Sequence, residues 1–311
     1  MGLVILFAFA ALLLTLLGVA GIAWLVLRPP RRSFGAALAR GYPTEPKDVG
    51  LAGKEVSFSL PGGARTLGFV LQGAKAEGPV AVVLHGHASS RFSALARTPW
   101  LAPHCATVVC FDWRGNGDAA GPGAVACDFG AMAGEDIAAV LAQVPGAAGR
   151  PLVLMGCSMG AGCALRAATT EPLAGRVACL VLDGAYRHWG VGIRNRLHER
   201  RKPVFFFFFV RFVVERFLPH LRHEDAYESV QHLRCPVLFL HGAADGVCPL
   251  ADVQAVAAAV PHDLAELVVF PAGGHLGLHR SDPARYEAAL GGFLRKNGAI
   301  PGHAPHPCLA Q

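Results

Sequence analysis

The sequence predicts an α/β fold in which helices cover both faces of a parallel sheet. Six short apolar runs lie at residues 80–84, 107–111, 152–155, 177–182, 237–240 and 267–270. Longer stretches with helical character separate most of these runs, for example at residues 134–144, 251–260 and 283–296. Strands that are apolar on both faces and alternate with helices are typical of a parallel sheet buried on both sides. Because ligands bind beyond the carboxyl ends of such strands, the residues that follow each run are the candidates for chemistry.

The composition indicates one large domain without a nucleic-acid partner. The chain has 311 residues, of which 53% are hydrophobic, and a net charge of +6. This is enough for one extensive core and too short for two full catalytic domains. The arginines form no stripe with interleaved aromatic residues, so no nucleic acid is expected to bind. The nine cysteines include no C-x-x-C pair and several lie in apolar runs, which predicts reduced core thiols, no metal site and no disulfide framework.

Residues 3–27 form an N-terminal segment without a charged side chain. As a helix it spans about 37 Å, enough to cross the hydrocarbon core of a bilayer. Trp24 suits the membrane interface, and Arg28, Arg31 and Arg32 follow with positive charge. Residues 1–32 are therefore interpreted as a single-pass membrane anchor with a basic flank. The positive-inside rule places the following domain in the cytoplasm.

A cleavable signal peptide is the alternative to this anchor. Its first residues are expected to be basic, and its apolar core is expected to be shorter, at roughly 7–15 residues. Here no Lys or Arg precedes the apolar segment, and the passable cleavage site at residues 37–39 lies far from it. The uncleaved anchor is therefore favoured.

The region between the anchor and the sheet is predicted to be a linker over residues 33–52. Alternating residues at 54–60 and 65–71 flank Pro61-Gly62-Gly63, which predicts a β-hairpin at the start of a domain covering residues 53–296. Residues 297–311 are predicted to be a disordered tail.

A nucleophile is predicted directly after the run at 152–155. The residues Gly156-Cys157-Ser158-Met159-Gly160 match the pattern G-x-S-x-G and precede a helix-like stretch of small residues. Such a strand–turn–helix junction is sharp and strained, and Gly156 and Gly160 remove side chains that would clash in it. The turn raises the Ser158 Oγ above the sheet at a helix N-terminus.

Two backbone groups are candidate donors to an oxyanion, which needs preorganised hydrogen bonds as its charge develops. The Met159 N–H follows the nucleophile directly. The loop after the run at 80–84 offers the N–H of His87. We interpret His85 as a buried structural histidine and the ring of His87 as a candidate for the pocket lining.

The base and the acid are predicted at two other strand ends. Asp245 follows the run at 237–240, and His275 follows the run at 267–270 through a glycine-containing loop. The chain order Ser158, Asp245, His275 is the order that a nucleophile elbow of this kind uses. His275 is expected to remove the Ser158 proton, while Asp245 orients the ring and stabilises the imidazolium.

Alternatives to these assignments come from neighbouring strand ends. Asp183 ends the run at 177–182 and is a rival for the acid, and His279 is a rival for the base. Asp112 ends the run at 107–111, and we expect it to bind Arg114 and hold its own loop.

The motifs HGHASS, FDWRGNGD, GCSMGAG, HGAADGVCP and GGH resemble those of the α/β-hydrolase superfamily, in particular its serine-aminopeptidase-like and membrane-associated branch. The resemblance covers residues 53–296. It implies an eight-stranded, mostly parallel sheet, hydrolysis of esters, thioesters or amides through an acyl-enzyme, and no cofactor. It also implies the triad Ser158, Asp245 and His275 with oxyanion donors at His87 and Met159. Gly117-Asp118 departs from the Gly-x-Ser of many relatives, which affects only the local pocket shape.

The resemblance also implies a cap over the site at about residues 186–233, where the β/α rhythm is absent. This interval contains basic residues and the run Phe205–Phe209. Two interpretations remain open. One is a cap helix packed on the core, and the other is a phenylalanine-rich face that dips into the bilayer and admits a lipid-like acyl substrate.

The sequence therefore predicts a membrane-anchored serine hydrolase with a small-molecule or lipid-like acyl substrate. The alternatives are a catalytically silent, membrane-tethered binding protein and an acyltransferase. The natural substrate, the acyl length and the oligomeric state stay open.

Overall fold

The computed structural model describes residues 1–32, 34–199, 201, 204, 206–223, 225–261 and 263–297. An eight-stranded sheet forms its centre, in the order β1-β2-β4-β3-β5-β6-β7-β8. Its strands are β1 (Gly53–Ser59), β2 (Arg65–Gln72), β3 (Val80–Leu84), β4 (Thr107–Phe111), β5 (Leu152–Cys157), β6 (Val177–Asp183), β7 (Val237–Gly242) and β8 (Ala265–Phe270). The β1–β2 and β2–β4 pairs are antiparallel and all other pairs are parallel, so the predicted fold class is confirmed. The predicted disordered tail lies, beyond Asn297, outside the described residues.

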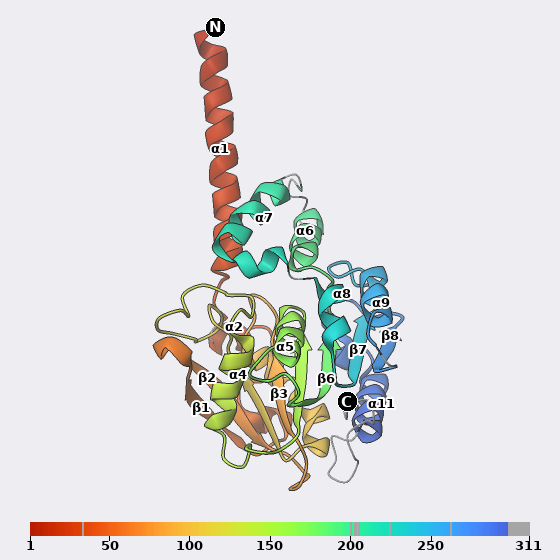
Figure 1. Cartoon of the computed structure of the whole chain (residues 1–311). Helices are drawn as coiled ribbons and strands as arrows, with labels where there is room; N and C mark the ends of the chain where they lie inside the picture. Colours follow the sequence, from red (N-terminus) through yellow and green to blue (C-terminus); the bar gives the residue numbers. More distant parts are fainter. Residues whose placement is uncertain are drawn as a thin grey trace.

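Helices cover both faces of this sheet (Figure 1). In β3, Val80, Val82 and Leu84 belong to one core and Ala81 and Val83 to the other, because successive side chains point to opposite faces. The first core is covered by α4 (Ala133–Ala142), α5 (Met159–Thr169) and α9 (Leu250–Ala258). The second is covered by α3 (Arg91–Leu95), α10 (Leu278–Ser281) and α11 (Pro283–Lys296).

Short helical elements complete the domain. They are α2 (Phe34–Leu38), α8 (Ala226–Ser229) and the 3-10 turns η1 (Pro46–Val49), η2 (Pro61–Gly63), η3 (Thr98–Trp100), η4 (Ala102–His104), η5 (Pro219–Arg222) and η6 (Val230–His232). The region predicted as a linker, residues 33–52, thus includes α2 and η1 in its described part.

The helix α1 (Gly2–Leu27) is long and apolar enough to cross a membrane. Figure 1 shows α1 extending away from the domain, with the end near Leu27 beside the helices above the sheet. Three buried residues near this end, Val19, Ala23 and Val26, belong to the same apolar core as residues of the domain. The outer part of α1 is exposed, whereas its last turns are packed on the protein.

The two longer helices of the predicted cap region are α6 (Trp189–Glu199) and α7 (Phe206–Phe217), which lie above one end of the sheet (Figure 1). One face of α7 is buried through Val210 and Val214 in the core that contains the end of α1. The other face carries exposed phenylalanines, namely Phe208, Phe209, Phe212 and Phe217. Phe205 lies outside the described residues. The helix is therefore packed on one side, and lipid contact through the other side stays a prediction.

A buried ion pair holds the start of α3 over the end of β4. The Asp112 carboxylate is fully buried and accepts hydrogen bonds of 2.6 Å from the backbone N–H and the guanidinium of Arg91. Our expectation that Asp112 binds Arg114 was wrong, because the Arg114 guanidinium binds the carboxylate of Asp136 in α4 at 2.7 Å. The backbone N–H at the start of α3 and the guanidinium of Arg91 both bind the Asp112 carboxylate. The spacing of residues near Asp112 in the chain does not predict this pair. Asp118 adds a 2.7 Å contact to Arg91.

Replacing Arg91 by Met is expected to lower the free energy of unfolding by about 3–5 kcal/mol, because it leaves Asp112 buried without a counter-ion. The matched control is Arg187→Met, which breaks an exposed 3.0 Å pair with Asp225 and is expected to cost at most about 1 kcal/mol. Thermal unfolding of the full chain in detergent, followed by circular dichroism, compares the two variants. Equal, small losses would show that Asp112 takes up a proton and needs no partner.

Candidate active site

The turn between β5 and α5 has the geometry of a nucleophile elbow. Ser158 adopts φ 52° and ψ −118°, a conformation that costs an L-residue about 1–3 kcal/mol. A Cβ on Gly156 would collide with the carbonyl of Gly160, and a Cβ on Gly160 would collide with the carbonyl of Leu84 in β3. Both glycines are therefore required by close backbone approach, as the sequence predicts.

Three side chains from three strand ends meet at this turn. The Nε2 of His275 lies 3.1 Å from the Oγ of Ser158. The Nδ1 of the same ring lies 2.8 Å from the Oδ2 of Asp245. Ser158 follows β5, Asp245 follows β7 and His275 follows β8. The structure thus brings the alcohol, the imidazole and the carboxylate into one hydrogen-bonded chain.

The loop after β7 fixes the Asp245 carboxylate. Burial by itself favours the neutral acid, but hydrogen bonds from His275 and from two backbone groups outweigh it and hold the pKa of Asp245 below its ordinary value. These backbone donors are the N–H groups of Val247 and Cys248, each 2.8 Å from Oδ1. Asp245 is therefore a carboxylate at neutral pH, with Oδ2 available to His275.

His241 is a supporting residue that the sequence analysis missed. It is fully buried, and its Nε2 donates to the carbonyl of Cys248 at 2.9 Å, which braces the loop that carries Asp245. The direction of this bond follows because a carbonyl only accepts. The sequence contained a signal for a role of His241 near Asp245, because His241 lies near the end of β7 in the motif HGAAD.

The rival residues occupy other places. The Asp183 carboxylate binds the Nε of Arg97 at 3.2 Å and the hydroxyl of Tyr286 at 3.3 Å. His279 is buried, with its ring 5.4 Å from that of Trp100, and burial lowers its pKa to about 3. The side chains hydrogen-bonded in sequence to the Ser158 Oγ are therefore those of His275 and Asp245, rather than those of His279 and Asp183.

The loop after β3 lies against the elbow. A Cβ on Gly86 would lie 3.3 Å from the Cβ of Ser158, so the loop approaches Ser158 closely. His85 is buried, accepts from the Trp113 N–H at 3.1 Å and donates to the Gly86 carbonyl at 2.8 Å. Burial lowers the pKa of His85 to about 4, so the ring is neutral and holds the loop. This is the structural place that the sequence predicts for His85.

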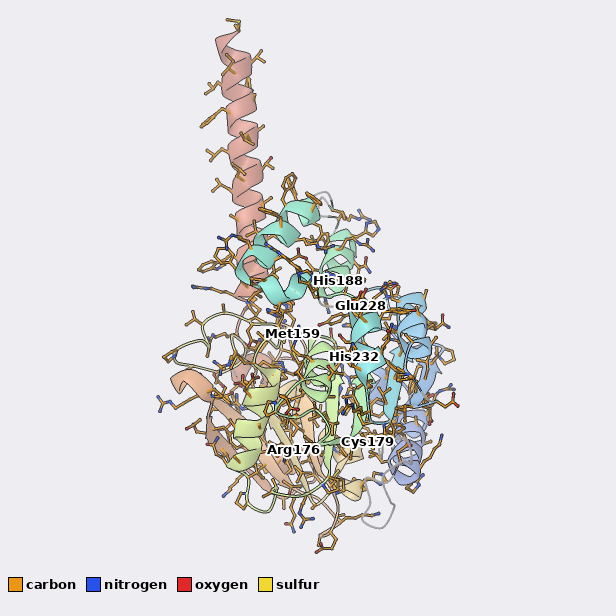
Figure 2. All side chains as sticks on the ribbon, viewed as in Figure 1. Met159, Arg176, Cys179, His188, Glu228 and His232 are labelled. Carbon is orange, nitrogen blue, oxygen red and sulfur yellow. The ribbon has the colours of Figure 1, made fainter. Side chains whose placement is uncertain are left out.

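Both predicted oxyanion donors belong to residues that line a cavity beside Ser158. Met159 is the first residue of α5, where a helix leaves its N–H groups without partners of its own. Among the described residues, no acceptor takes the His87 N–H. Figure 2 shows Met159 on the side of the domain that faces α6 and α7, whereas Arg176 and Cys179 lie toward the opposite end of the sheet. The two predicted donors and Ser158 therefore line one cavity at the edge of the sheet that faces α6 and α7.

The ring of His87 connects this loop to α1. Its Nε2 donates to the carbonyl of Val26 at 2.8 Å, and the ring stacks on Phe129 with centroids 5.3 Å apart. Burial lowers the pKa of His87 to about 4, so the ring is neutral. The Cys127 N–H also donates to the Leu27 carbonyl at 2.7 Å. Two carbonyls that a helix C-terminus leaves unpaired are thus satisfied by the domain.

The cavity has a volume of about 730 Å³, within the usual range for ligand pockets. Ser158 and Met159 belong to its lining. Its walls include residues of three segments that lie before or above the sheet: Gly18, Ile22, Leu25 and Val26 of α1; Ala36, Ala37, Arg40 and Tyr42 of the region after α1; and Trp189, Gly192, Ile193, Arg196 and Leu197 of α6. The sequence analysis assigned residues 1–52 to an anchor and a linker and did not place them at the site.

One cluster that includes Asp245 and His275 has the residue types of a metal site. The ligand atoms of Asp245, Cys248 and His275 lie within 4.8 Å of one another. Asp245 and His275 already bind each other, and burial raises the pKa of the Cys248 thiol far above its ordinary value. A protonated thiol is a poor metal ligand, so this cluster fits a proton-transfer pair better than a metal. The eight cysteines in the described part of the chain are all free and buried.

Comparison with known proteins places the fold. The profile of the alpha/beta hydrolase family matches residues 81–289. No curated protein sequence matches the chain.

Solved structures of similar fold include an esterase of Pyrococcus furiosus, with a TM-score of 0.66 and 20% identity over 87% of this chain and 98% of the esterase. A thermophilic esterase of Thermogutta terrifontis has a TM-score of 0.56 and 23% identity over 78% of this chain and 98% of the other. A membrane phospholipase A described as a bacterial virulence factor has a TM-score of 0.58 and 21% identity over 92% of this chain and 98% of the other.

Proposed function

The chain belongs to the alpha/beta hydrolase family, and on that premise we propose that it is a serine hydrolase that cleaves esters of hydrophobic acyl groups. The observation that carries this proposal is the continuous hydrogen-bonded chain from the Ser158 Oγ through His275 to Asp245. The esterase and phospholipase activities named for proteins of similar fold support an ester as the substrate. The apolar side chains along the cavity support a hydrophobic acyl group.

In the first half of the reaction, the Ser158 Oγ attacks the ester carbonyl carbon while the Nε2 of His275 accepts the hydroxyl proton. The negative charge moves to the carbonyl oxygen, where the N–H groups of His87 and Met159 stabilise it. The bond to the alkoxy group then breaks, and the imidazolium of His275 gives its proton to the departing alcohol. The acyl group remains on Ser158 as an ester.

In the second half, a water molecule attacks the acyl carbon and gives one proton to His275. The bond to the Ser158 Oγ breaks, and the proton on His275 returns to that oxygen. The acid product leaves and the hydrogen-bonded chain is restored. Asp245 stays ionised throughout and stabilises the imidazolium that forms in each half.

We also propose the domain organisation predicted from the sequence, with an uncleaved membrane anchor over residues 1–32, a catalytic domain over residues 53–296 and a cap at about 186–233. The contacts of the Val26 and Leu27 carbonyls with the domain support an anchor that stays attached. The basic residues Arg28, Arg31 and Arg32 support a cytoplasmic position of the domain.

The test is covalent labelling of the full-length protein in detergent by a fluorophosphonate probe. We expect labelling on the peptide that contains Ser158, located by mass spectrometry, together with turnover of p-nitrophenyl butyrate. Heat-unfolded protein is the control and should not be labelled. A folded protein that neither reacts with the probe nor turns over esters would support the binding-protein alternative. Transfer of the acyl group to added alcohols in preference to water would support an acyltransferase.

A further inference from the structure

The α1 residues that line the cavity lie on one face of the helix. Gly18, Ile22, Leu25 and Val26 follow the spacing at which residues lie above one another on a helix. From Gly18 to Val26 this stripe is about 12 Å long, comparable to a medium-length acyl chain. A Cβ on Gly18 would meet nothing within 4 Å, so the stripe is open at that end.

Three contacts hold this stripe in register with the nucleophile. The ring of His87 binds the carbonyl of Val26, and the Nε of Arg32 donates to the Ala88 carbonyl at 2.7 Å. The Cys127 N–H binds the carbonyl of Leu27. The loop that offers the oxyanion donor thus also carries the end of α1, and the helix is part of the site rather than a tether beside it.

The stripe leads along α1 toward the exposed, apolar part of the helix, which has the composition of a membrane-spanning segment. Before Gly18, α1 continues for about four turns as mostly exposed apolar residues. The helix α7 packs on α1 and carries exposed phenylalanines, among them Phe208 and Phe212. Exposed aromatic side chains beside an apolar helix are typical of a membrane interface. An acyl chain that lies along α1 can therefore reach the cavity from the bilayer.

The charged residues of the cavity have one sign. Its lining includes Arg32, Arg40 and Arg196 and contains no Asp or Glu. Within the described part of the chain, the guanidinium groups of Arg40 and Arg196 have no hydrogen-bond or ion-pair partner, and both residues are exposed. Guanidinium groups without a carboxylate partner beside an apolar cavity favour an anionic group on the ligand.

We propose that the substrate is a membrane lipid ester with an anionic headgroup, whose acyl chain lies along the α1 stripe and whose headgroup is attracted by Arg40 and Arg196. This proposal rests on the proposed ester hydrolysis and adds the substrate class and the helix that selects it. The membrane anchor thereby supplies one wall of the acyl-binding cavity.

The first experiment places a larger side chain on the α1 stripe. Ile22→Trp in the full-length protein is expected to lower kcat/KM for p-nitrophenyl laurate by about 10- to 100-fold, because two or three methylene groups lose their buried position. Hydrolysis of p-nitrophenyl butyrate should fall by less than about threefold, since the short chain makes little contact with the stripe. The matched control is Ala20→Trp on the opposite, exposed face of α1, which should alter neither substrate.

The outcomes separate this proposal from the proposed function. Equal loss on both substrates, no loss on either, or the same loss in Ala20→Trp would overturn the stripe as the acyl site while leaving the hydrolase intact. Absence of turnover and of probe labelling in the wild type would instead remove the proposed function.

The second experiment tests the headgroup in nanodiscs. The wild type is expected to hydrolyse phosphatidylglycerol about tenfold faster than phosphatidylcholine, and Arg196→Gln should lose most of this preference. Arg194→Gln removes the same charge from α6 at a residue outside the cavity lining and should keep the preference. No preference in the wild type, or equal loss in both variants, would overturn the anionic headgroup.

Discussion

Replacing Ser158 by Ala is expected to lower kcat for p-nitrophenyl butyrate by about 10⁴- to 10⁶-fold, because the hydroxyl is the only group on which the acyl-enzyme can form. The remaining rate comes from substrate binding and the oxyanion donors. The fold should be retained, since the new alanine would occupy the same strained backbone conformation with one atom fewer. Steady-state kinetics on the full-length protein in detergent measures the loss.

The control for Ser158→Ala is the thermal midpoint, which should stay close to that of the wild type. A variant that unfolds at the same temperature but keeps kcat within tenfold of the wild type would show that another group is the nucleophile. Loss of both activity and folding would be resolved by Ser158→Cys, which keeps a nucleophile at the elbow and is expected to react with thiol reagents.

Replacing Asp245 by Asn is expected to lower kcat by about 10⁴-fold, through the tautomer of His275. The Asn Oδ1 can keep the hydrogen bonds from the Val247 and Cys248 N–H groups, which places the Nδ2 against the ring. The amide then donates to the Nδ1 of His275, so the ring proton moves to Nε2. An Nε2 that carries a proton cannot accept the one on Ser158.

The contrast for Asp245→Asn is Asp183→Asn at the rival acid. Asp183 is bound to Arg97 and Tyr286, so its replacement should lower the thermal midpoint by breaking a buried pair. It should not lower kcat to a comparable extent. If Asp183→Asn lost activity by orders of magnitude and Asp245→Asn did not, the assignment of the acid would be wrong.

The lowered pKa of Asp245 also sets a direction for the pH dependence of stability. Because the folded-state pKa lies below the ordinary value, the carboxylate contributes stability above the ordinary pKa of an aspartate, and this contribution is lost as pH falls through the folded value. Asp245→Asn removes this contribution and should make the thermal midpoint less sensitive to acid. Thermal unfolding of both proteins across the acidic range measures the difference.

The strands of the sheet are predictable because their signal is local. The bounds of β3 and β4 equal the predicted runs, and α11 begins at Pro283 after Asp282, whose side chain accepts from the Arg285 N–H. The strand β5 extends two residues past its apolar run, since Gly156 and Cys157 continue the pairing with β6. The helix α3 has five residues, too few to show a helical period.

The contact among Ser158, His275 and Asp245 is also accessible from sequence, because each residue follows an apolar run at a strand end and parallel strands place those ends at one edge. The choice between Asp245 and Asp183 is not accessible in the same way. Both stand at strand ends, and the difference arises from Arg97 and Tyr286, which reach Asp183 from other parts of the chain.

Residue order along the chain was enough for the sheet, the elbow and the apolar N-terminal helix, since each depends on neighbours a few positions apart. The sequence alone could not place α1 against the domain, because the contacts that hold it join distant residues. The bond between His87 and Val26 joins residues 61 apart, and the bond between Arg31 and Ala124 joins residues 93 apart. The first bond forms only when the folded domain presents a donor to a helix end whose carbonyls lack partners. The second forms only when the domain presents the Ala124 carbonyl to the guanidinium of Arg31. Folding thereby makes the apolar N-terminal helix into a wall of the cavity beside Ser158.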